Sequence, residues 1–195
     1  MKCRVGFGVL CVWLAATIMG CTFVPLVQTS LTSTAQAGDP PPATSTPAPG
    51  RPLVGLKVGN RAPDFTLRNL QGQDVALHDL QGRVVLMNFW AVWCGFCRVE
   101  MPELQMAYET YGHEGLVVLG IDVQEETAQV ASFVQEMGVT FPILLDQKAA
   151  VTRQYRIQGL PTSILVDADG VIRAVHVGPL TRQEIAGYLA QVEGE

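Results

Sequence analysis

The stretch VLMNFWAVWCGFCRVEMPEL, residues 85–104, decides the fold of this chain. It begins with a short apolar run that is rich in β-branched residues at its start and interrupted only by Asn88, which predicts a buried central strand. Cys94 and Cys97 follow the strand, and we expect a helix from about residue 96 to 111. The two cysteines therefore lie where a strand ends and a helix begins.

This placement suits a redox-active pair, because two cysteines three residues apart on a first helical turn can close a short disulfide ring. Cys94 is expected at the helix N-terminus, where unpaired N–H groups and the helix dipole favour a thiolate. Cys97, one turn further in, is expected to be more buried and to act as the resolving thiol. Exchange through a mixed disulfide then runs in either direction, reducing a partner's disulfide or oxidising its dithiol.

Half of a zinc site is the alternative interpretation of the two cysteines, and it would need two further ligands. The three histidines are widely scattered in the sequence, and the other three cysteines all lie in the first 21 residues. We therefore predict no metal site and no cofactor apart from the Cys94–Cys97 disulfide. Two cysteines also cannot form the disulfide framework of a small secreted domain.

Outside residues 85–104, strands and helices alternate and a hairpin and a last helix follow, which predicts an α/β architecture with a mixed sheet. Thr181 and Glu184 form a capping box at the start of the last helix. The further strands are expected at 65–67 and 75–77 (a short hairpin), 116–121, 142–145, 162–166 and 171–175, and the further helices at 125–137, 149–155 and 181–192.

The N-terminus predicts export from the cytoplasm. Lys2 and Arg4 precede an uncharged run, residues 5–27, that is long enough to span a bilayer. The run either stays as a membrane anchor, is processed and lipidated at Cys21, or is removed by cleavage near Ala37. All three outcomes place the rest of the chain outside the cytoplasm.

The chain is thus expected to have three parts. Residues 1–27 form the signal or anchor segment, residues 28–52 a linker rich in Pro, Thr, Ser and Ala, and residues 53–195 the folded domain. The formal net charge is −5 and the sequence has no block of Lys and Arg, which argues against a nucleic-acid partner.

Residues 85–104 resemble the active-site segment of thioredoxin-fold proteins, and more narrowly that of the TlpA/ResA-like membrane-tethered thiol–disulfide oxidoreductases, many of which serve cytochrome c maturation. Residues 62–65 (APDF) match the opening motif that this group shares with peroxiredoxins, and residues 159–162 (GLPT) match its cis-proline loop. The resemblance runs from about residue 58 to the C-terminus. It implies a thioredoxin-like three-layer fold with a central mixed sheet, an N-terminal β-hairpin and an extra strand–helix insertion between Cys97 and Pro161.

The resemblance also implies roles for residues around the cysteines. Pro161 is expected in the cis form facing the disulfide, and the backbone of Leu160 is expected to pair with an extended substrate peptide. Thioredoxin has a buried, proton-handling Asp where this chain has Asn88, which cannot titrate. Glu100, three residues after Cys97 on the same helix face, is therefore expected to handle protons, which requires that it be partly buried.

The aromatic residues near the motif divide into two kinds. Trp90 is expected in the core, whereas Trp93 is expected to shield the disulfide and to form part of the docking surface. Phe96 stands where many relatives have Pro, so the redox potential cannot be assigned by resemblance, and a docking role for its ring is a hypothesis. Pro102 is expected to lie inside the helix, as in the family.

The leading functional hypothesis is a monomeric disulfide reductase outside the cytoplasm that takes electrons from a thiol-reducing donor in the membrane. By resemblance, its client would be the haem-binding cysteine pair of apocytochrome c. A disulfide-forming oxidase or isomerase, a thiol peroxidase and a thioredoxin-fold binding module without turnover are the alternatives. The first two differ from the leading hypothesis in electron flow, and the intact cysteine motif argues against the third.

Overall fold

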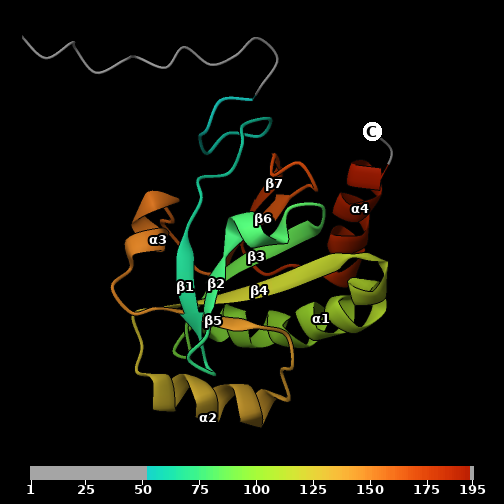
Figure 1. Ribbon diagram of the computed structural model, residues 1–195. Helices are drawn as coiled ribbons and strands as arrows, with labels where there is room; N and C mark the ends of the chain where they lie inside the picture. Colours follow the sequence, from blue (N-terminus) through green and yellow to red (C-terminus); the bar gives the residue numbers. More distant parts are fainter. Residues whose placement is uncertain (1–51, 194–195) are drawn as a thin grey trace, which may run out of the picture. The chain divides into compact units, whose positions relative to one another are not determined.

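The computed structural model describes residues 52–193 and contains a seven-stranded mixed sheet in the order β2-β1-β5-β4-β3-β6-β7 (Figure 1). The strands are β1 (Thr66–Asn69), β2 (Asp74–Ala76), β3 (Val84–Trp90), β4 (Leu116–Val123), β5 (Ile143–Asp146), β6 (Thr162–Val166) and β7 (Ile172–Val177). The helices are α1 (Gly95–Tyr111), α2 (Thr127–Met137), α3 (Ala150–Gln154) and α4 (Arg182–Glu193), with short 3-10 turns η1 (Leu77–Leu80) and η2 (Gly112–Glu114).

Strand β3 lies in the interior of the sheet, between β4 and β6, in agreement with the buried strand that the sequence predicts. It pairs in parallel with β4 and antiparallel with β6, and β4 pairs in parallel with β5. Its side chains alternate between two cores, because successive residues of a strand point to opposite faces. Leu86 and Trp90 lie in one core, and Val85, Met87 and Phe89 lie in the other.

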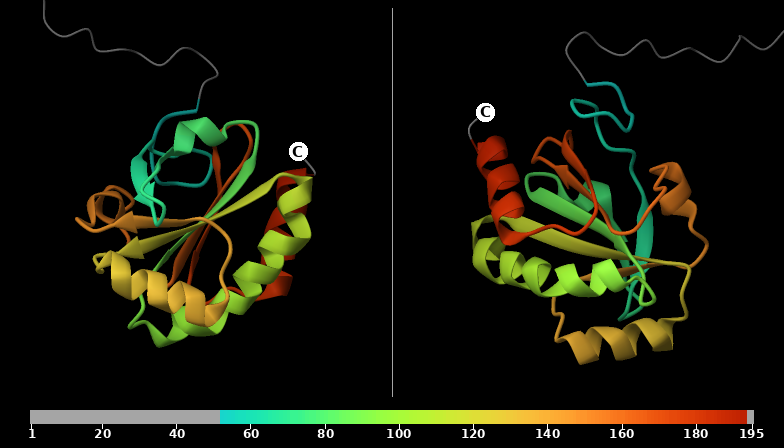
Figure 2. Two further views of the ribbon diagram at one scale, coloured as in Figure 1. Left: turned by 60° about the horizontal axis from the view of Figure 1, so that its bottom comes forward. Right: turned by 180° about the vertical axis from the view of Figure 1, so that it is seen from behind.

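Helices cover both faces of this sheet, which confirms the predicted three-layer α/β fold (Figure 2). Helices α1, α2 and α4 supply buried side chains to the core around Trp90. Helix α3, the turn η1 and residues 62–65 pack into the core around Phe89. The segment between the cysteines and Pro161 holds β4, α2, β5 and α3, in agreement with the expected strand–helix insertion.

Local sequence signals account for the chain turns. The carboxamide oxygen of Asn69 accepts the N–H groups of Gln71 and Gln73 at 3.0 and 2.9 Å, which closes the predicted β1–β2 hairpin. The predicted capping box is present at α4: Thr181 N–H donates to Glu184 at 2.9 Å, and Glu184 N–H donates back to the Thr181 hydroxyl at 3.3 Å.

Most element boundaries differ from the predicted ones by one or two residues, and one of these differences bears on the site. The sequence pattern placed the start of a helix at residue 125, but α2 begins at Thr127 and β4 continues to Val123. The backbone of Gln124 has a φ of 63°, and that of Glu126 is extended, so neither residue can belong to a helix. Glu125 therefore lies in the loop between β4 and α2, and its carboxylate accepts a hydrogen bond from the backbone of Val92.

The predicted segment 1–27 and the predicted linker 28–52, except for its last residue, lie outside the described residues, and the domain boundaries stay predictions. Among residues 52–193, no helix is both long and apolar enough to cross a membrane.

Candidate active site

Cys94 and Cys97 form a disulfide with an S–S distance of 2.10 Å. Cys94 is the N-cap residue of α1, as predicted, and its Sγ accepts the N–H of Cys97 at 3.1 Å. Cys94 is 5% exposed to solvent, whereas Cys97 is fully buried. A thiolate on Cys94 would lie against an N–H group at the positive end of a 17-residue helix, which favours the charged form.

A tight turn leads from β3 to the first cysteine. The N–H of Cys94 donates to the carbonyl oxygen of Ala91 at 3.1 Å, so Val92 and Trp93 are the central residues of the turn. Between the cysteines, the space around Gly95 is open, because an added Cβ there would have no other heavy atom within 4 Å beyond its chain neighbours. The first turn of α1 is thus fixed by its backbone rather than by packing at residue 95.

Glu100 is buried beside the pair, on the same helix as Cys97. It is 1% exposed, and both of its carboxylate oxygens accept hydrogen bonds. Asn88 Nδ2 donates to Oε1 at 2.8 Å, and the N–H of Leu180 donates to Oε2 at 2.9 Å. Asn88 Nδ2 also reaches Ser163 Oγ at 2.9 Å, which sequence reasoning did not anticipate. The partial burial that the predicted role requires is therefore present.

Burial raises the pKa of Glu100 from 4.5 to about 7, and the two hydrogen bonds from Leu180 and Asn88 limit the rise. A carboxyl group with a pKa near neutrality can gain or lose a proton under physiological conditions. A pocket of about 410 Å³ between α1 and the segment before α4 is lined by Glu100, Glu103, Pro179 and Leu180, among others. Glu100 therefore borders this pocket, while its side chain itself is almost fully buried.

An exposed apolar surface lies next to the disulfide. Trp93 is 73% exposed and Phe96 is 68% exposed, in keeping with the docking surface predicted for them. Val99 is 68% exposed as well and was not predicted. Its signal was present in the sequence, because Val99 follows Phe96 by three residues and so lies on the same side of the helix.

The cis-proline prediction is confirmed, since the Leu160–Pro161 peptide bond is cis. Pro161 is buried, and Leu160 is half-buried against the core that contains both cysteines. Trp90 is fully buried, and Pro102 lies inside α1, both as predicted.

Two further acids near the pair were missed. Asp122 and Glu125 are both buried at the end of β4, and Glu125 Oε2 accepts the N–H of Val92 at 2.6 Å. The available signal was their position directly after a predicted buried strand, since the carboxyl ends of neighbouring parallel strands meet at one edge of a sheet.

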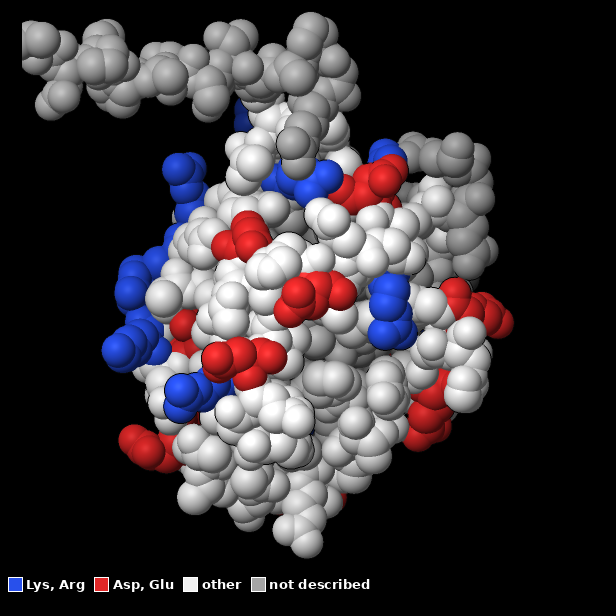
Figure 3. Space-filling model, viewed as in Figure 1, with Lys and Arg blue, Asp and Glu red and all other residues white. Residues whose placement is uncertain are grey.

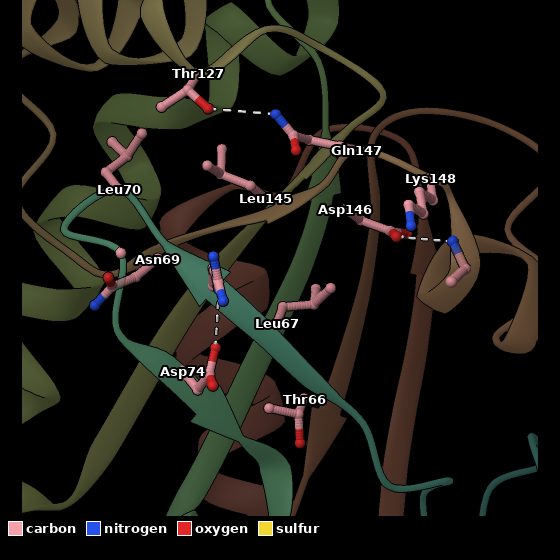
Figure 4. A pocket seen from close by; sticks show the side chains of 13 residues that line it. Thr66, Leu67, Asn69, Leu70, Asp74, Thr127, Leu145, Asp146, Gln147 and Lys148 are labelled. Carbon is pink, nitrogen blue, oxygen red and sulfur yellow. Dashed lines mark hydrogen bonds and ion pairs between the residues drawn. The ribbon is translucent and has the colours of Figure 1, made fainter.

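Another pocket, of about 600 Å³, is formed by β1 and the segment from Leu145 to Ala150 (Figure 4). Gln147 Nε2 donates a hydrogen bond to the Thr127 hydroxyl at 3.3 Å in this pocket, and none of the lining residues belongs to the predicted site.

On the face seen in Figure 3, Lys and Arg are interspersed with Asp and Glu. Within residues 52–193, no three His, Cys, Asp or Glu side chains are arranged to hold a metal ion.

Residues 58–175, more than half of the chain, match the AhpC/TSA family. The chain belongs to the AhpC/TSA family. Among its relatives, this AhpC/TSA protein is 34% identical over 137 residues to the thiol-disulfide oxidoreductase ResA of Bacillus thuringiensis, an alignment that covers 70% of this chain and 79% of that one. It is 38% identical over 135 residues to the thioredoxin-like protein YneN of Bacillus subtilis, covering 68% and 78% of the two chains.

A solved structure extends this comparison. A Chlorobium tepidum protein proposed to be the thiol:disulfide interchange protein DsbE superposes with a TM-score of 0.67 and 31% identity, over 71% of this chain and 99% of that one. Family, fold and disulfide agree, and this AhpC/TSA protein is a thioredoxin-like thiol-disulfide oxidoreductase of the ResA-like group.

Proposed function

We propose that this protein is a reductase of protein disulfides that works outside the cytoplasm. The observation that carries the proposal is the asymmetry of the pair. Cys94 lies at the N-cap of α1, where its Sγ accepts the N–H of Cys97, whereas Cys97 is fully buried on α1, three residues before the buried Glu100. This asymmetry suits Cys94 as the attacking thiolate and Cys97 as the resolving thiol.

In the first step, the Cys94 thiolate attacks one sulfur of a client disulfide. A mixed disulfide forms, and the other client sulfur leaves as a thiolate and takes a proton from solvent. Cys97 then gives its proton to the Glu100 carboxylate and attacks Cys94 Sγ. This step closes the Cys94–Cys97 disulfide and releases the second client thiolate. Two electrons have passed to the client, and a thiol-reducing donor must return them.

For docking, we propose that the exposed surface of Trp93, Phe96 and Val99 contacts the client, and that Leu160 offers its backbone to an extended client segment before the cis Pro161. The three side chains are apolar and exposed, and they lie within five residues of Cys94, the cysteine of the pair with some solvent exposure. Large exposed apolar side chains of this kind commonly mark interaction sites.

The docking proposal predicts a selective kinetic defect. Phe96→Ala and Val99→Ala are each expected to raise the KM for reduction of insulin by about tenfold, the effect of losing one well-packed interface contact. Reaction with glutathione disulfide, which is too small to cover this surface, should stay unchanged. Val58→Ala, at an equally exposed valine that is 61% exposed, serves as the matched control. Equal rates with insulin in all variants would contradict the docking role.

The place of action rests on the N-terminal sequence. The basic residues, the long apolar run and the Pro-rich linker support a domain held at the outer face of the cytoplasmic membrane, by a retained anchor or by a lipid on Cys21. A membrane protein of the thiol-reducing type is then the natural electron donor. The resemblance of residues 85–104 to the TlpA/ResA-like group, many members of which serve cytochrome c maturation, supports a client such as apocytochrome c.

The direction of electron flow is tested by the equilibrium reduction potential of the pair, measured in thiol redox buffers by gel shift. We expect a value near or below that of thioredoxin, about −270 mV, because a reductase must hold its electrons less tightly than its client. A value near that of DsbA, about −120 mV, would make the protein an oxidant and would overturn the proposal.

A further inference from the structure

At the end of β4, two buried carboxyl groups approach the turn that leads to Cys94. Asp122 is fully buried and lies opposite Trp90 in the pairing of β3 with β4. Glu125 is 9% exposed, and its Oε2 accepts the N–H of Val92 at 2.6 Å. Val92 is the first central residue of the turn that Ala91 and Cys94 close. A carboxylate from another strand connection therefore holds the backbone two residues before the attacking cysteine.

The connection that carries these acids is strained. Gln124 lies between them with a φ of 63°, a left-handed conformation that a residue with a Cβ adopts at a cost. Its N–H donates to the carbonyl oxygen of Asp146 on β5 at 3.3 Å. Strain of this kind persists only where the surroundings enforce it, and here it lies directly before the residue that holds Val92.

The two acids cannot both carry a charge without mutual repulsion. Among the described residues, neither oxygen of Asp122 has a conventional hydrogen-bond donor. Burial, and then the Glu125 carboxyl group, raise the pKa of Asp122 to about 8, and the nearby backbone N–H of Glu125 limits the rise. Asp146, the other acid that faces Asp122, is engaged by Ala150 and Thr152 at the start of α3 at 2.7 Å, as Figure 4 shows in part. Because both carboxyl groups are buried and Glu125 raises the pKa of Asp122, the two acids can hold one proton between them.

We propose that Asp122 and Glu125 are a proton-sharing carboxyl pair that positions the active-site turn for attack by Cys94. Asp122 donates its proton to one oxygen of Glu125, which leaves the other oxygen to accept the N–H of Val92. Loss of the shared proton at alkaline pH would put two negative charges side by side and loosen the turn. Both acids act as positioning residues, and the inference rests on the attacking role proposed for Cys94.

The shared proton is tested in the oxidised full chain, purified in detergent, where the cysteines cannot titrate. The probe is the ¹⁵N–¹H shift of the Val92 amide between pH 5 and 10. We expect an inflection near pH 8 in the parent protein. Asp122→Asn should abolish the inflection, because the carboxamide donates a hydrogen bond at every pH. The control is Glu126→Gln, at the exposed neighbouring acid, which should retain the inflection. An unchanged inflection in Asp122→Asn would overturn the proposal.

The positioning role is tested by the second-order rate at which reduced protein reacts with glutathione disulfide. We expect Glu125→Ala to lower this rate about tenfold, the effect of losing a hydrogen bond to a charged acceptor. Glu125→Gln should lower it less, because its amide oxygen can still accept from Val92, and it covers the case in which the alanine variant does not fold. Parent-like rates in both variants would refute the positioning role. A parent protein that did not react would instead contradict the proposed function.

Discussion

Cys94→Ser is expected to abolish thiol–disulfide exchange, lowering the rate of insulin reduction by about a thousandfold or more, because removal of a covalent nucleophile costs orders of magnitude. The residual thiol of Cys97 cannot substitute for it, since Cys97 is fully buried whereas Cys94 is 5% exposed. A serine at the N-cap still accepts the N–H of residue 97, so α1 should keep its start. The measurement is the initial rate of insulin reduction at neutral pH.

The matched variant is Cys97→Ser, which removes the resolving thiol and leaves the attacking one. It should react once with a client and then accumulate as a mixed disulfide, detectable as a higher-mass band on a non-reducing gel. Accumulation of the adduct in Cys94→Ser instead of Cys97→Ser would reverse the assigned roles. Full activity of Cys94→Ser would point to a binding module whose cysteines do not turn over.

Glu100→Gln is expected to slow the resolving step about a hundredfold at pH 7, the usual contribution of a positioned general base. The first attack by Cys94 should change little. A glutamine fits the site once the Asn88 carboxamide turns over, because one end then accepts from Leu180 and the other donates to the Asn88 carboxamide oxygen, which has no partner among the described residues at present. Stopped-flow kinetics of mixed-disulfide decay separates the two steps. Glu103→Gln, at an acid lining the same pocket, is the control.

The same variant should change how stability depends on pH in the oxidised protein. Below pH 4.5 the carboxyl group is protonated in both states, and its contribution to stability is complete. As the pH rises, the unfolded chain ionises first, so the free energy of unfolding falls by about 3 kcal/mol between pH 4.5 and 7. Asp122, whose pKa is also raised, lowers the free energy of unfolding further as the pH rises. Urea unfolding of Glu100→Gln should show a flatter profile, and an identical profile would mean that Glu100 titrates normally in the fold.

Much of the fold could be predicted because its signals are local. The apolar run before Cys94, the turn residues at Asn69 and the capping box at Thr181 each specify an element through residues close in sequence. The burial of Glu100 was a weaker expectation, since it depends on Asn88 and Leu180, residues that lie 12 and 80 positions away.

The pair Asp122 and Glu125 escaped prediction for a related reason. Sequence periodicity assigned Glu125 to an amphipathic helix, where an acid would be taken for part of a solvated face. Its real partner is a backbone N–H on another strand connection, 33 residues away. The left-handed backbone of Gln124 also has no sequence signal, because glutamine rarely adopts it.

The open space at Gly95 and the exposed ring of Phe96 have a practical consequence. Neither residue contributes to the buried cores, so the dipeptide between the cysteines can be exchanged without repacking the protein. The scaffold could therefore host a library of dipeptides at these two positions, giving a graded series of redox reagents that differ in potential and, through residue 96, in the clients they dock, while they keep the same buried cores.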